Sequence, residues 1–129
     1  MKVEVVRTSD FDVASMVARS SHPEGEEIVR DFVKRSLVVF VGKADGVEAC
    51  VVGLIPETIL SDRAYLWMLH TDICEAHPLR FVRWSRRVIA ELPYRELFGH
   101  CVNATSRQWL EWLGAEFVNE NSFRIAKDG

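Results

Sequence analysis

Residues 103–117 constrain the fold of this chain more than any other stretch. Thr105 and Gln108 have the spacing of a capping box, in which two side chains satisfy backbone N–H groups at the start of a helix. Three residues at helical spacing give this segment one apolar side: Trp109, Leu110 and Leu113. Gly114 suits the left-handed position that ends a helix. The pattern predicts a helix of about two turns between a polar strand end at Asn103 and a short strand from residue 115.

Length and charge limit the classes of protein to which this chain can belong. A chain of 129 residues that is 48% hydrophobic can bury one core and leaves little room for a second, so we expect a single domain over residues 1–129. A net charge of −3 gives no general attraction to nucleic acid or to an anionic membrane. The chain also lacks the continuous apolar run of a signal peptide or of a membrane span. We therefore expect it in the cytoplasm of its host.

The three cysteines, Cys50, Cys74 and Cys101, are odd in number and lie in or beside apolar segments. This distribution favours buried, reduced thiols over a disulfide framework. Cys74 and His77 have a ligand-like spacing, but a zinc site needs more ligands, so no metal site is predicted.

Apolar periodicity predicts an alternation of strands and helices along the whole chain. A strand near Val3 leads to a helix capped by Ser9 or Asp10, and a turn at Asp45 and Gly46 joins two β-branched strands. Residues 72–77 break the pattern, and Pro78 starts the next helix at its favoured first position. The other expected elements are a helix over residues 24–36, strands over 37–41, 47–55, 64–71 and 97–102, and a terminal strand pair over 115–118 and 122–126.

The spacing from Asn103 to Gly114, followed at once by a strand, resembles the last conserved motif of the GCN5-related N-acetyltransferase (GNAT) superfamily. The resemblance implies an α/β (α+β) fold with a mixed, mostly antiparallel sheet, helices on both faces, and a splay between the fourth and fifth strands. It also implies an acetyl-CoA or other acyl-CoA cofactor and transfer of the acyl group to an unknown amine or protein substrate.

Residues 65–117 are most similar to a branch of that superfamily found in bacteriophages, which includes internal virion or assembly proteins of podophages. The motifs that carry this resemblance are Trp67 to Thr71, His77-Pro78, the arginine-rich residues 80–87, and residues 103–114. It implies a phage-encoded acyltransferase or, alternatively, a catalytically inactive domain that acts in virion assembly or is packaged in the virion. Virion proteins are then possible partners. Trp84, Trp109 and Trp112 are numerous enough for one of them to serve an interface between copies of the chain.

By the same resemblance, acyl-CoA contacts are assigned to two strand ends and one helix start. Leu69, His70 and Thr71 end the strand that would bind the pantetheine arm, and Asn103 matches a residue that either binds the ligand or caps the helix. The turn that would hold the pyrophosphate lacks the usual glycines, so Arg80 is the phosphate contact that remains. The strip of arginines that it begins, Arg80, Arg83, Arg86 and Arg87, is alternatively a solvated face, and a nucleic-acid role is disfavoured.

The superfamily's usual acid, a tyrosine four residues before the helix-ending glycine, is Leu110 here. His70 and Asp72 are the candidates to replace it as catalytic acid or base, because they lie at the mouth of the expected cleft.

Overall fold

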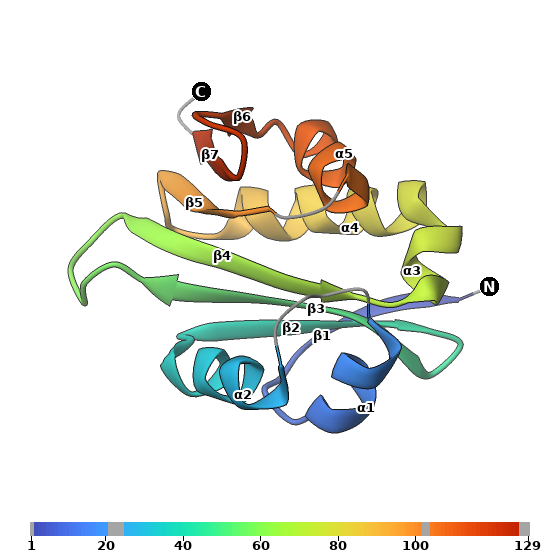
Figure 1. The fold of residues 1–129 in the computed structure, drawn as a ribbon. Helices are drawn as coiled ribbons and strands as arrows, with labels where there is room; N and C mark the ends of the chain where they lie inside the picture. The colour runs from blue at the N-terminus through green and yellow to red at the C-terminus, as the bar shows by residue number, and fades with distance from the viewer. Residues whose placement is uncertain (1, 21–24, 102–103, 127–129) are drawn as a thin grey trace.

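The computed structural model describes residues 2–20, 25–101 and 104–126 (Figure 1). The strands are β1 (Val3–Arg7), β2 (Val38–Ala44), β3 (Val47–Pro56), β4 (Arg63–His70), β5 (Glu96–His100), β6 (Glu116–Phe117) and β7 (Ser122–Ala126). The helices are α1 (Val13–Arg19), α2 (Glu26–Arg35), α3 (Asp72–Ala76), α4 (Pro78–Glu91) and α5 (Ala104–Trp112).

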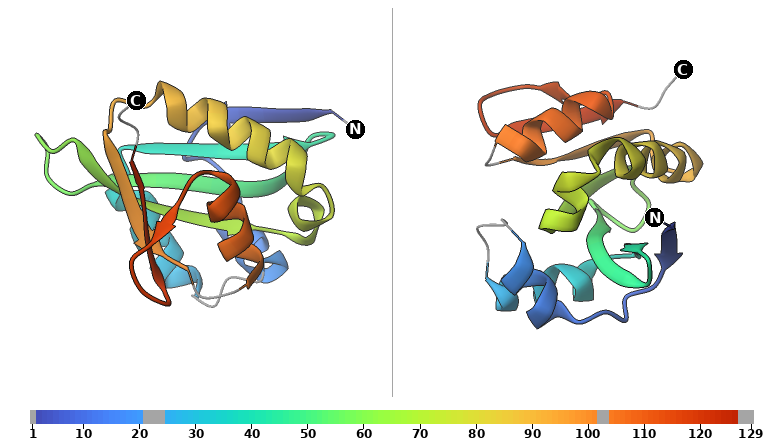
Figure 2. Two further views of the ribbon diagram at one scale, coloured as in Figure 1. Left: turned by 90° about the horizontal axis from the view of Figure 1, so that it is seen from above. Right: turned by 90° about the vertical axis from the view of Figure 1, so that its right-hand side faces the viewer.

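One seven-stranded sheet, in the order β1-β2-β3-β4-β5-β7-β6, runs through the described part of the chain. All neighbouring strands are antiparallel except β4 and β5, which are parallel. Helices α1 and α2 cover one face, and α3, α4 and α5 lie on the other (Figures 1 and 2). The predicted mixed, mostly antiparallel sheet with helices on both faces is confirmed.

The alternation of side chains along β4 divides the core between these two faces. Trp67 and Leu69 pack with residues of α1 and α2, including Met16 and Val29. Leu66, in the same strand, belongs to the core on the opposite face. β4 is therefore buried on both sides.

Local signals account for most of the boundaries. The Asp45-Gly46 turn has positive φ at both residues (49° and 82°), as a two-residue hairpin of the I′ type requires. Asp12 caps α1, with its side chain accepting a hydrogen bond from the Ser15 N–H at 3.0 Å, so the prediction of Ser9 or Asp10 as cap was wrong by two residues or more. Helix α5 ends as predicted at Gly114 (φ 92°), where the Ala115 N–H donates to the Leu110 carbonyl.

Residues 72–77 are not the irregular turn that the sequence predicted. Asp72–Ala76 form the short helix α3, with Thr71 at its N-cap position, and α4 begins as predicted with Pro78 in its first turn. The physical reason is tertiary: the Thr71 N–H and hydroxyl both donate to the Ala49 carbonyl, and Cys74 is fully buried. These contacts hold a five-residue helix that its own propensity would leave marginal.

Among the described residues, no helix has the length and apolar character needed to cross a bilayer.

Candidate functional site between strands β4 and β5

Strands β4 and β5 pair over only three positions and then separate. The register joins Arg63 to Glu96, Ala64 to Leu97, and Tyr65 to Phe98, although β4 continues to His70. Figure 1 shows β5 leaving the direction of β4 beyond these pairs. We call the space beyond Tyr65 and Phe98 the wedge. The predicted splay between the fourth and fifth strands is thus confirmed.

A glycine lies where the two strands begin to part. A Cβ atom on Gly99 would stand 2.6 Å from the Leu66 carbonyl oxygen and 2.9 Å from the Phe123 ring. Any side chain at this position would force β5 away from β4 or from β7. Gly99 therefore sets how closely the strands approach at the start of the wedge.

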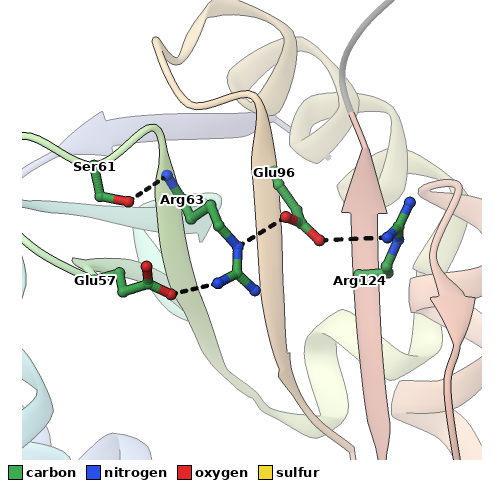
Figure 3. A network of polar contacts seen from close by, with 5 residues as sticks. All are labelled: Glu57, Ser61, Arg63, Glu96 and Arg124. Atoms are coloured by element: carbon green, nitrogen blue, oxygen red, sulfur yellow. Dashed lines mark hydrogen bonds and ion pairs between the residues drawn. The ribbon is translucent and has the colours of Figure 1, made fainter.

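Ion pairs link the strands at the end where β4 and β5 are paired (Figure 3). We call the line along which β4 and β5 adjoin the seam, and this paired end its closed end. The Arg63 Nε donates to Glu96 at 2.8 Å, the Arg63 Nη1 binds Glu57, and Glu96 also lies 3.7 Å from the Arg124 guanidinium. The Arg63 guanidinium additionally stacks 4.8 Å from the centre of the Phe98 ring. This network joins β4, β5 and β7 at the end where the strands are paired.

The backbone of β4 presents alternate residues to the wedge. Thr71 donates its N–H to Ala49 on the β3 side, whereas the Asp62 carbonyl accepts from Arg95 on the β5 side. Because backbone groups alternate in direction along a strand, Met68 and His70 direct theirs toward β5. The β4–β5 register does not reach them. The residue after His70, Thr71, forms an isolated antiparallel bridge with Ser20. Met68 is therefore the position of this edge where an extended polar ligand could add hydrogen bonds.

The three predicted pantetheine contacts thus differ in direction. The His70 backbone faces the wedge, whereas Leu69 and Thr71 pair with β3 through Val51 and Ala49. The Leu69 side chain is buried in the α1 and α2 core, and the Thr71 hydroxyl is bonded to Ala49 at 2.8 Å.

The His70 side chain is buried on the α4 face, with 5% of its surface exposed. Its Nδ1 lies 3.1 Å from a Glu75 carboxylate oxygen, and its ring stacks on Trp109 with centroids 5.8 Å apart. Burial lowers the pKa of His70 below its ordinary value, and the Glu75 carboxylate opposes this shift by a smaller amount. A neutral imidazole under an indole ring is the expected state at pH 7.

The region predicted to hold the pyrophosphate carries both signs of charge. Asp72 and Glu75 are exposed in the first turn of α3, where they oppose the approach of a phosphate. The first turn of α4 contains no acid and carries the exposed Arg80. The anion-compatible position is therefore the start of α4.

The α5 side of the wedge is apolar. Trp109 is 4% exposed and also stacks on Phe81 of α4, and Leu110 is 1% exposed within the core. Leu110, at the position where the GNAT resemblance implies a tyrosine, is therefore a packing residue. Asn103, the predicted second strand-end contact, lies outside the described residues.

Sequence reasoning missed a polar pair on the α2 face of the sheet. The Tyr65 hydroxyl of β4 lies 3.4 Å from Nδ1 of His100 of β5, and the two rings are 5.8 Å apart. His100 is exposed and Tyr65 half-buried. Both belong to residues that bound the start of the wedge. The 35-residue separation in sequence left no local signal for this pair.

The cysteines and acids do not form a metal centre within the part of the chain that the structure describes. Cys50, Cys74 and Cys101 are all buried and free of disulfide bonds, as their apolar surroundings predicted. Burial raises the pKa of the Cys74 thiol, which keeps it protonated and weakly nucleophilic.

Comparisons with known proteins bear on the fold. No family model matches the sequence, and no curated protein matches it. Solved structures do match, including the ribosomal-protein-S18-alanine N-acetyltransferase of Escherichia coli, with a TM-score of 0.73 at 14% identity over 99% of this chain and 96% of that one.

Three further solved structures have the same fold. A putative acetyltransferase from Exiguobacterium sp. 255-15 has a TM-score of 0.73 at 16% identity, covering 98% of this chain and 95% of that one. An acetyltransferase of Bacillus subtilis in complex with CoA has a TM-score of 0.69 at 10% identity, covering 97% and 99%. A putative acetyltransferase from Desulfovibrio desulfuricans, described as a member of the GNAT family, has a TM-score of 0.72 at 14% identity, covering 98% and 100%. The order of the elements, the wedge and these likenesses together show that the chain has the fold of the GNAT acetyltransferases.

Proposed function

We propose that this protein binds an acyl-CoA along the wedge-facing edge of β4 and transfers the acyl group to an amine. The observation that carries the proposal is the three-residue pairing of β4 with β5, beyond which Met68 directs its backbone groups into the wedge. The CoA complex of the Bacillus subtilis neighbour supports this class of ligand.

The residues present fit one part of an acyl-CoA better than the other. The pantetheine arm is an extended chain with two amides, and it can run along the edge of β4 at Met68, beyond the pairing with β5, where strand-like hydrogen bonds to a ligand are possible in geometry. The diphosphate needs backbone N–H groups and cations, and α3 offers two exposed acids instead. We therefore assign the phosphate contact to Arg80 and the start of α4, and we expect weak binding.

Bound acyl-CoA supplies an acyl group already activated as a thioester. The chain then has to orient that group, admit an amine and move protons. His70 and Asp72 remain the groups predicted from sequence for the last task. His70 is buried beside Glu75, whereas Asp72 is exposed at the start of α3, so the two occupy different environments.

A calorimetric titration with CoA and acetyl-CoA tests the proposal. We expect both to bind, and Arg80→Ala to weaken binding by about tenfold, because a charged hydrogen bond to phosphate is lost. Arg87→Ala is the matched control, since that arginine lies two turns further along α4, over the Trp84 ring at 5.7 Å. No heat of binding with either compound at concentrations on the order of millimolar would remove the proposal.

A second candidate is a catalytically inactive GNAT-fold domain of a bacteriophage that acts in virion assembly or is packaged in the virion. Two observations favour it: α3 replaces the glycine-rich turn, and the position of the usual tyrosine is the core residue Leu110. Under this proposal the protein would be recovered from purified phage particles, and acyl-CoA would be bound without turnover. Turnover with an amine acceptor would exclude it.

A further inference from the structure

A tyrosine and a histidine face each other across the start of the wedge. The Tyr65 hydroxyl and the His100 Nδ1 are 3.4 Å apart, at the long end of the hydrogen-bond range. Catalytic hydrogen bonds are often long before substrate binds. Both groups reach the surface, since His100 is exposed and Tyr65 is half-buried. The pair can therefore exchange protons with a ligand and with solvent.

Both side chains project from fixed backbone. His100 pairs with Ser122 of β7, and the next residue, Cys101, donates its N–H to the Asn121 carbonyl at 2.7 Å. The Tyr65 ring packs against two other rings, Phe32 of α2 at 6.0 Å and Phe98 of β5 at 5.8 Å. Groups held on rigid strands in this way keep the geometry that a proton transfer needs.

Among the described residues, the charged side chains near the pair are bound to one another. On this face of β4, β5 and β7, the charged side chains of the described residues are Arg63, Glu96 and Arg124, and they bind one another at the closed end of the seam. On α2, Arg35 stacks 5.7 Å from the Phe32 ring and pairs with Asp31 at 3.0 Å. The imidazole of His100 contacts both the hydroxyl and the ring of Tyr65.

We propose that His100 and Tyr65 are the proton-transfer pair of the acyl-transfer reaction, with the amine approaching from the α2 face. This inference rests on the proposed function and names residues for it. The His100 Nε2 takes one proton from the incoming ammonium, while the second proton that nitrogen loses goes to water. The Nδ1–H of His100 passes a proton to the Tyr65 oxygen as the Tyr65 O–H protonates the departing sulfur. One C–N bond forms and one C–S bond breaks, with no change of oxidation state.

His70 is less suited to this task, although it is the histidine that sequence patterns favoured. Its ring is 5% exposed, faces α4 and is covered by Trp109. A base that must take a proton from an external amine has to be reached by that amine. Of the two histidines beside the wedge, His70 is therefore packed in the core and His100 is accessible.

The kinetic test measures release of CoA thiol with spermidine, tryptamine and a peptide with a free amino terminus as acceptors. We expect His100→Gln to lower kcat by about 10²-fold or more while KM for acetyl-CoA changes little. Tyr65→Phe, which keeps the ring, should lower kcat by a smaller factor and alter the pH profile. Glu91→Gln, at the exposed far end of α4, is the control and should leave kcat unchanged.

A second readout does not depend on turnover. Imidazole signals of His100 in 15N NMR report which ring nitrogen carries the proton, and contact with Tyr65 should bias that tautomer. We expect Tyr65→Phe to shift the His100 signals and to leave those of His77 in place. Unshifted His100 signals would overturn the inference.

The outcomes separate the two proposals. Calorimetric binding of acetyl-CoA with unchanged kcat in His100→Gln would overturn the pair and leave the proposed function standing. Binding without turnover in the unmodified protein would also overturn the pair, because there would be no proton transfer to assist. No binding of CoA or acetyl-CoA would remove the proposed function and the pair with it.

Discussion

The two faces of the β4–β5 seam each carry a histidine, and the two histidines have opposite environments. On the α4 face, His70 is buried beneath Trp109 and held by Glu75. On the α2 face, His100 is exposed and contacts the half-buried Tyr65. The first arrangement disfavours a charged imidazole, whereas the second leaves the imidazole accessible to a ligand. Position relative to the core, and not residue type, decides which histidine is available for chemistry.

The largest expected effect tests the packed face. Trp109→Ala should reduce the free energy of unfolding by about 3 to 5 kcal/mol, because it removes a buried indole that stacks on His70 and Phe81. Urea denaturation provides the measurement. Trp112→Ala, at a half-buried position of the same helix, should cost clearly less. If the two variants lost the same free energy of unfolding, the face that carries His70 would not be the more tightly packed one.

The next test asks whether the core beside α5 can accept a tyrosine at position 110, where the GNAT resemblance implies one. Leu110→Tyr should destabilise the protein by about 1 to 3 kcal/mol, because the core around Leu110 has no room for a larger polar ring. Denaturation of the variant beside Glu111→Gln, an exposed neighbour, measures this. If Leu110→Tyr were neutral in stability and raised turnover, the α5 side would belong to the chemistry after all.

Stability should also depend on pH through His70. Its pKa is lowered in the folded protein by burial, so the unfolded chain binds a proton that the folded protein does not. The free energy of unfolding should thus be highest above the ordinary histidine pKa, fall by at most about 1.4 kcal/mol per pH unit below it, and level off below the folded pKa. Denaturation between pH 8 and about 5.5 should show this loss, and His70→Gln should lack it. If the unmodified protein and His70→Gln showed the same pH dependence, burial of His70 would not be its cause.

The smallest effect concerns the closed end of the seam. Arg63→Ala removes a half-buried ion-pair network and a stacked guanidinium, and should cost about 1 kcal/mol. Arg30→Ala, which breaks an exposed pair within α2, is the control and should cost only a few tenths. A double-mutant cycle of Arg63 and Glu96 measures their coupling. Zero coupling would show that backbone pairing alone closes this end.

Much of the fold could be predicted because local chemistry sets it. The positive φ of Asp45-Gly46, the first-turn position of Pro78 and the left-handed Gly114 each follow from the residue present. Helix α3 could not be predicted, because its stability comes from Cys74 in the core and from the bonds of Thr71 to Ala49.

The candidate site was predictable only in outline. The order of elements indicated a gap beside β4, but which β4 residues face that gap depends on register, and the predicted contacts included Leu69 and Thr71, which pair with β3. Tyr65 and His100 meet through a parallel pairing of distant segments, which no local pattern encodes.

Backbone amide NMR of the isotope-labelled protein with and without CoA tests the central claim most directly, namely that the β4 edge in the wedge binds the thioester carrier. We predict that the Met68 amide shifts and exchanges more slowly when CoA is present, while the Thr71 amide, already bonded to Ala49, stays unchanged. CoA binding that leaves the Met68 amide unaltered would contradict this claim.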